Sequence, residues 1–151
     1  FNELSINENI PLLAYSPLAR GLLTGKYIGN KIPKGSRLSR DDKIRKIVNE
    51  NSDLAVKSYC SLASKYNIDP IHMSLAFCHE RPFMGSVIFG ATDITQLKKI
   101  LAGINLKLDS EINDEIQMLQ KVSLNFLEFL KVYFSLENKF CKYSILCHHT
   151  L

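Results

Sequence analysis

Side chains that could bind an anion cluster in one segment, Pro11–Tyr27, which begins with a short apolar run. Ser16 contributes a hydroxyl at a turn, and Gly21 permits a ligand to approach the backbone closely. Arg20 and Lys26 add two positive charges within the same segment. Together these are the groups that an anionic ligand needs beyond the end of a strand. Ser-Pro and Gly-Lys pairs are also common in ordinary polar loops, so the residues alone leave both interpretations open.

A second segment with the same potential follows the apolar run Ser86–Phe89. Gly90 ends that run, and either Thr92 or Asp93 can cap a helix over Ile94–Ala102. A strand followed by glycine, a hydroxyl and a helix is a recurrent phosphate site, because backbone N–H groups and the helix dipole face the anion. If the two strands are neighbours, we expect the two segments to lie side by side.

The elements that must position these residues can be read from the apolar pattern. Pro11–Tyr15 and Ser86–Phe89 show no alternation, which is typical of parallel strands buried on both faces. A basic loop at 29–42 is either a solvated connection or a flap over a phosphate-bearing ligand. The expected helices run from about 53 to 67, from Pro70 with Asp69 as its cap, over 94–102, and onward from a cap at Asp109 or Ser110.

Two histidines on the expected helix after Asp69 deserve a separate interpretation. His72 and His79 lie about two helical turns apart, and no carboxylate completes a ligand set with them. We interpret them as helix-surface or interface residues and not as metal ligands.

Composition indicates one globular domain and argues against several classes of partner. The chain has 151 residues and a net charge of +4, with its lysines scattered, so nucleic-acid binding is not indicated. Its four cysteines match no zinc spacing, and no signal peptide precedes them, which favours free thiols in the cytoplasm. No apolar run approaches the roughly 20 residues that span a bilayer.

The composition changes after Lys121, where aromatic and apolar residues are frequent and would lie on all sides of a helix, with no apolar stripe. Three alternatives stay open for 121–151: an additional packed helix, a sticky interaction tail, or read-through from a damaged gene. Cys141, Cys147, His148 and His149 cluster there without the spacing of a known metal site.

Two separated motifs resemble a known family. AYSPLARGLLTGKY is similar to the seventh-strand segment of aldo-keto reductases, in the branch with Tas-like reductases and potassium-channel β subunits, and SVIFGATDITQL is similar to the eighth strand and its helix. The resemblance implies an α/β fold, namely the last two β/α units of a (β/α)8 TIM barrel plus C-terminal helices. We expect this barrel part at 1–120 and a divergent tail at 121–151, since a complete barrel needs roughly 250 residues.

For function, the resemblance implies the cofactor-binding portion of an enzyme that transfers a hydride between NADPH and an aldehyde or ketone. Tyr15 corresponds to an aromatic residue that stacks on the nicotinamide, and Gln96 to an adenosine contact. Lys26 and Arg37 correspond to cations that contact the phosphates. Ser16, Pro17, Leu18 and Gly21 correspond to the loop around the pyrophosphate, and Gly90 and Thr92 match the phosphate site after the eighth strand. Arg20, which we include in the cofactor site, replaces a small residue of most relatives and adds a positive charge there.

The chain also departs from the family pattern. Ile100 stands where relatives usually place an Asn against the adenine, and Lys99 stands where an acidic residue is common. The family's catalytic Asp, Tyr, Lys and His come from strands upstream of Phe1, so we expect no catalysis by this chain alone. A non-enzymatic, NADPH-responsive binding module, with a protein partner at the tail, and an inert gene remnant are the alternatives. Two strands without their barrel neighbours would also expose apolar edges, which predicts aggregation.

Overall fold

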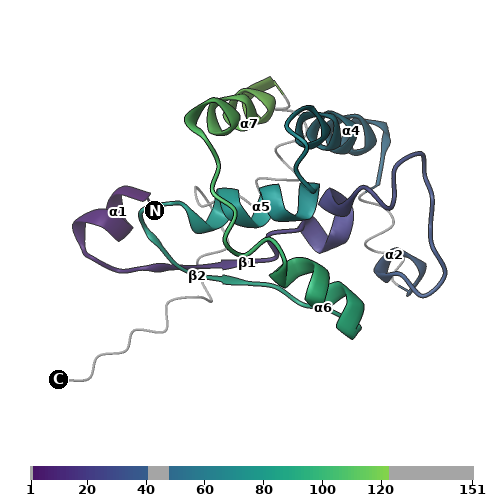
Figure 1. The fold of residues 1–151 in the computed structure, drawn as a ribbon, viewed down its shortest axis with the longest axis horizontal. Coiled ribbons are helices and arrows are strands. Elements are labelled where there is room, and N and C mark those ends of the chain that lie inside the picture. The colour runs from purple at the N-terminus through teal and green to yellow at the C-terminus, as the bar shows by residue number, and fades with distance from the viewer. Residues whose placement is uncertain (1, 41–47, 123–151) are drawn as a thin grey trace.

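The computed structural model describes residues 2–40 and 48–122 of the chain (Figure 1). Predictions that concern the tail at 121–151 therefore fall almost wholly outside the described residues. The described elements, in chain order, are α1 (Asn2–Asn7), β1 (Leu12–Tyr15), the 3-10 segment η1 (Ala19–Thr24), α2 (Arg37–Arg40), α4 (Glu50–Lys65), α5 (Pro70–His79), β2 (Met84–Ile88), α6 (Ile94–Leu101) and α7 (Ser110–Val122).

Strands β1 and β2 pair in parallel, with Tyr15 opposite Ile88 at their carboxyl ends. Helix α5 covers one face of this sheet, where Val87 packs against the buried Ile71 and Leu75 (Figure 1). On the other face, side chains from both strands are exposed. The prediction that both strands are buried on both faces is therefore wrong, because within the described residues a helix covers only one face.

Helix α5 lies between the sheet and a second layer formed by α4 and α7 (Figure 1). Its far side supplies Met73, Ala76 and Phe77 to a core completed by those two helices. The members from α4, from the segment before α7 and from α7 itself are Leu62, Ala63, Leu108, Ile112 and Ile116. Helix α5 is therefore apolar on nearly every side, as expected for a helix buried between two layers.

Helix α5 begins at the side-chain cap expected from the sequence, whereas helix α4 begins earlier than expected. Asp69 accepts a hydrogen bond from the Ile71 N–H at 2.9 Å, directly before Pro70, as predicted. Helix α4 begins before the predicted Asp53, because Asn49 and Ser52 form a reciprocal capping box. Leu54, one residue after Asp53, is exposed.

Three short elements were not predicted from the sequence. Helix α1 lies in the polar stretch before β1, η1 replaces the loop after β1, and α2 interrupts the basic loop at 29–42. Helix α2 has a single turn, and its Leu38 is buried against η1. The buried leucine, not helix propensity, accounts for α2, because an isolated turn is unfavourable in water.

The end of α6 is joined to the start of α5 by three close contacts. The Lys99 ammonium lies 2.9 Å from Asp69 Oδ2, and the Lys99 carbonyl lies 2.7 Å from His72 Nε2. A Cβ built on Gly103 would lie only 2.1 Å from the His72 ring, so this position requires glycine. His72 thus has the interface role that we inferred, and Lys99, the departure from the family pattern, contributes an ion pair.

The exposed face of the sheet generates the first prediction. Leu13, Tyr15 and Ile88 are 43%, 70% and 44% exposed, and each strand has an edge left unpaired by the described residues. We expect the chain to self-associate through this face. The double substitution Leu13→Lys and Ile88→Lys should reduce light scattering and the sedimenting fraction.

The matched control is Leu54→Lys, which adds charge at an exposed leucine on α4, remote from the sheet. If the control reduces association as strongly as the sheet variant, the added charge is responsible and the sheet face is not.

The Asp69–Lys99 ion pair generates the second prediction. Partial burial opposes ionisation, but hydrogen bonds from Lys99 and the Ile71 N–H hold the pKa of Asp69 below its usual value. A lowered carboxyl pKa stabilises the fold above the ordinary Asp value, and that contribution is lost as the pH falls below it. Asp69→Asn keeps a capping oxygen and should lower the free energy of unfolding by about 0.5–1 kcal/mol near pH 7.

This difference between Asp69→Asn and the parent chain should shrink below about pH 3, where the carboxyl is protonated in the unfolded state. Denaturant titrations at the two pH values measure it, with Asp114→Asn, an exposed position on α7, as the control. A difference that does not change with pH would show that the substitution acts through the cap alone.

Candidate functional site

The carboxyl ends of β1 and β2 bring the two predicted anion-binding segments together. Tyr15 and Ile88 are register partners, and the Ser16 N–H donates to the Ile88 carbonyl at 3.2 Å. The loop that begins at Ser16 and the loop that begins at Phe89 therefore leave the sheet side by side, at the carboxyl ends of the two strands. We call this end of the sheet the carboxyl edge. This arrangement confirms the expected adjacency of the two motifs.

The loop after β1 is compact and conformationally unusual. Ser16, Ala19 and Arg20 have φ values of 60°, 47° and 58°, and Gly21 has 91°. Left-handed backbone is costly for residues other than glycine and is retained where the surroundings hold it in place. Backbone hydrogen bonds close the turns. The Ala19 N–H donates to the Ser16 carbonyl at 2.9 Å, and the Gly21 N–H donates to the Leu18 carbonyl at 2.8 Å.

Buried side chains fix this loop to the rest of the fold. Ala19, Leu22 and Leu23 are all nearly inaccessible and belong to one cluster with Tyr27 and Leu38. The cluster thus joins η1 to α2, the element that carries Arg37. Arg37 is exposed and directly precedes Leu38, so the docking of Leu38 sets where this cation emerges.

Lys26 is a predicted cation that the structure places against the loop. A Cβ built on Gly21 would lie 3.4 Å from Lys26 Nζ, so the ammonium lies over the glycine. Its other neighbour is the Tyr27 ring, whose centroid is 5.0 Å from Nζ. The Thr24 hydroxyl donates to the Gly21 carbonyl at 2.7 Å and so secures the turn between Gly21 and Lys26.

The predicted site residues after β2 contact one another. Gln96 Oε1 accepts from the Thr92 N–H at 3.2 Å and lies 3.1 Å from the Thr92 hydroxyl. Asp93 caps α6 by accepting from the Gln96 N–H at 2.9 Å, which decides between the two predicted caps. Gly90 is exposed, and the described residues leave open space beside it.

The start of α6 is consequently occupied by its own side chains. Asp93 places a carboxylate where an anion would otherwise meet the free N–H groups of the helix. The Gln96 amide donates to the same carboxylate at 2.5 Å. On the β1 side, by contrast, the Lys26 ammonium lies over Gly21.

Ile100, which stands where relatives usually place an Asn against the adenine, is only 5% exposed and packs with Ile71 and Leu75. It fastens α6 to α5 beneath the sheet edge. An Asn introduced there would bury an amide among apolar side chains, which is costly.

Sequence reasoning missed Ser74, which contacts this site from below. Its hydroxyl donates to the Pro17 carbonyl at 2.6 Å, although the two residues are 57 positions apart. A serine among the apolar residues of α5 was the available signal, but nothing in the sequence paired it with Pro17.

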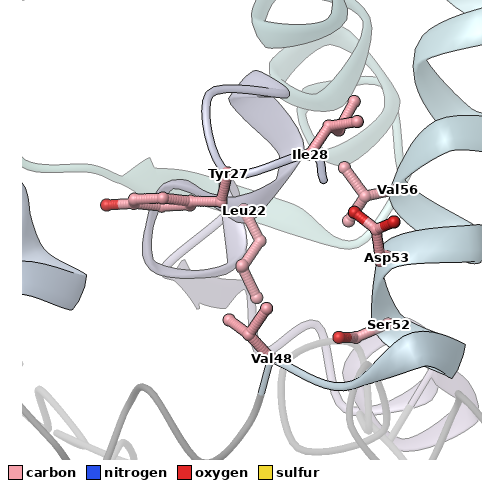
Figure 2. A pocket seen from close by; sticks show the side chains of 7 residues that line it. All are labelled: Leu22, Tyr27, Ile28, Val48, Ser52, Asp53 and Val56. Atoms are coloured by element: carbon pink, nitrogen blue, oxygen red, sulfur yellow. The ribbon is translucent and has the colours of Figure 1, made fainter. Parts of the chain in front are cut away.

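A small hollow lies behind η1, on the side of α4 (Figure 2). Including the part open to solvent, it measures about 200 Å³, and Figure 2 shows Leu22 and Ile28 facing Val56 and Asp53 across it. A hydrogen bond from Lys57, at 2.6 Å, and another from the Gly29 N–H, at 2.9 Å, lower the pKa of Asp53. This carboxylate is therefore satisfied by structural partners, and the mainly apolar hollow offers no catalytic constellation.

The described residues contain neither a candidate metal site nor a candidate membrane-spanning helix. Between 2 and 122, leaving aside 41–47, no three His, Cys, Asp or Glu side chains are placed to hold a metal ion. None of the helices in that part combines the length and apolarity of a membrane span. Cys60 and Cys78 are free thiols, whereas Cys141 and Cys147 fall outside the described part.

Comparison with known proteins gives a family match and several relatives. The family model described as "Aldo/keto reductase family" matches residues 2–121. Protein tas of Escherichia coli strain K12 is 36% identical over 120 residues, which is 80% of this chain and 35% of that protein.

A probable voltage-gated potassium channel subunit beta of Arabidopsis thaliana is 30% identical over 110 residues, covering 70% of this chain and 33% of that protein. An L-glyceraldehyde 3-phosphate reductase of Escherichia coli strain K12 is 31% identical over 104 residues, or 66% and 30% of the two chains. The chain spans about a third of the length of these relatives. With its two-stranded parallel sheet and covering helices, it belongs to the aldo/keto reductase family.

Proposed function

We propose that this chain is the cofactor-binding portion of an aldo-keto reductase that transfers a hydride between NADPH and an aldehyde or ketone. The single observation that carries the proposal is the parallel pairing of β1 and β2, which aligns two anion-binding loops at one edge. In a complete (β/α)8 barrel these strands would be the last two of the ring, and residues 1–120 would form this part of it. The loops after those strands are a frequent phosphate site in such barrels.

The phosphates of NADPH would rest on the β1 side of this edge. Ser16, Pro17, Leu18, Arg20 and Gly21 form the turn whose backbone they would approach. Lys26 lies over that turn and is exposed, so its ammonium is available to a phosphate. Electrostatics support this placement. The Lys26 ammonium attracts a phosphate to the β1 side, whereas the Asp93 carboxylate repels it from the start of α6.

The nicotinamide and adenosine ends would take the two flanking positions. Tyr15 is 70% exposed at the carboxyl end of β1, and an exposed aromatic face at a site is suited to stacking on a planar ring. Gln96 would meet the adenosine after leaving its contacts with Thr92 and Asp93, and Gly90 leaves room for that approach.

A second candidate function is a binding subunit that responds to NADPH without catalysis. It is favoured by the similarity to a protein named as a potassium channel subunit beta. Both candidates predict NADPH binding at the same edge, and they differ in whether a protein carrying this chain oxidises NADPH when an aldehyde is added.

The third prediction tests the phosphate contacts. Titration of the chain with NADPH, followed by the cofactor's fluorescence, should show saturable binding in low salt. Lys26→Met and Arg37→Met should each weaken it about fivefold, the effect of roughly 1 kcal/mol from one exposed charge pair. The loss should shrink in high salt, because exposed charges are screened.

Lys107→Met serves as the control, since it removes an exposed positive charge beside Leu108, whose N–H bonds to Glu80 before the amino end of β2 and not to the loops at the carboxyl ends. Equal losses for all three variants would mean that only the net charge matters. Losses at Lys26 and Arg37 that do not depend on salt would mean that these side chains act through packing.

A further inference from the structure

Ser74 is a buried serine on helix α5, whose buried faces are otherwise apolar. It is 1% exposed and lies at the centre of α5, between Met73 and Leu75. A hydroxyl removed from water destabilises a protein unless it has a hydrogen-bond partner. Here the partner is the Pro17 carbonyl, 2.6 Å from the hydroxyl oxygen.

The bonded carbonyl belongs to the turn that begins the candidate phosphate loop. Pro17 is itself buried and follows Ser16, the first residue of this turn with left-handed backbone. The hydrogen bonds within the turn are local and join residues two to five positions apart. The longer-range bonds on Ser16 and Pro17 join the turn to the sheet, through Ile88, and to α5, through Ser74.

The surroundings of Ser74 make this contact stronger. Tyr59 of α4 lies beside it, and burial raises the pKa of the phenol, which therefore stays neutral. The Tyr59 hydroxyl itself forms no hydrogen bond within the described part of the chain. In such a poorly hydrated environment a made hydrogen bond is strengthened, and an unmade one is costly.

We propose that Ser74 is a positioning residue for cofactor binding. Its hydroxyl holds the Pro17 carbonyl, and so keeps the left-handed turn through Ser16, Ala19 and Arg20 in the shape that receives the NADPH phosphates. Only the effect on NADPH binding rests on the proposed function. Anchoring of the turn can be measured without any cofactor.

Hydrogen exchange with mass spectrometry on the full chain, in dilute solution, tests the anchoring. Ser74→Ala should speed exchange in peptides covering 16–24 roughly tenfold, the factor expected for one buried hydrogen bond. Ser52→Ala is the matched control, because Ser52 is the other buried serine among the described residues and its hydroxyl bonds with the Asn49 backbone at the start of α4. It should speed exchange at the start of α4 and leave 16–24 unchanged.

Ser74→Thr restores the donor and should return exchange at 16–24 towards the parent rate. Unchanged exchange in Ser74→Ala, or equal acceleration at 16–24 in Ser52→Ala, would overturn the anchoring role. Equal acceleration in Ser74→Ala and Ser74→Thr would also overturn it, since the volume of residue 74 would then matter more than its hydroxyl.

The second arm is an NADPH titration of the same variants. Ser74→Ala should weaken binding about tenfold, Ser74→Thr should recover most of it, and Ser52→Ala should not change it. A parent chain that does not bind NADPH would refute the proposed function, while the exchange data would still decide the anchoring. A loosened turn with unchanged NADPH affinity would overturn the positioning role alone.

Discussion

The burial of α5 between two layers is the constraint on which the described fold depends. One side of this helix covers the β1–β2 sheet, and the other side completes the core with α4 and α7. Because its side chains are committed in both directions, the position of α5 fixes the sheet relative to the outer helices. Interiors are close-packed, so a shift of α5 would have to displace both layers.

This constraint reaches the candidate site through polar contacts at two points. Ser74 joins the middle of α5 to the turn after β1, and the Asp69–Lys99 pair joins its start to the end of α6. The helix therefore holds both segments that flank the carboxyl ends of the strands. Helix α5 therefore positions the candidate site at the carboxyl ends of the strands from beneath, while Tyr15 and Lys26 at that site remain exposed.

Local chemistry was predictable from the sequence, and it gave most of the elements. Asp69 with Pro70 marked the start of α5, and the two candidate caps Thr92 and Asp93 marked the start of α6, where Asp93 is the cap. The exposure of the sheet was not predictable, because apolar residues on both faces of a short strand do not say which neighbours are present. Tyr15 and Leu13 look the same in the sequence whether covered or open.

The candidate site was predictable to a similar degree. The loop residues and their adjacency followed from the two motifs, since parallel strands place their carboxyl ends together. The burial of Ile100 was not predictable, because a position in a motif does not reveal that the helix turns its side chain towards α5. Left-handed backbone at Ala19 and Arg20 was also hidden, since neither residue prefers it and tertiary contacts impose it.

The contact between Gly103 and the His72 ring limits which mutations the family member represented by this chain can accumulate. The ring occupies the volume of any β-carbon at position 103, so even alanine would displace it and break its bond to the Lys99 carbonyl. In a library of random variants selected for folding, position 103 should stay fixed while exposed neighbours such as Ile104 vary freely. A second-site change that shortens residue 72 would be the simplest route by which a side chain could enter at 103.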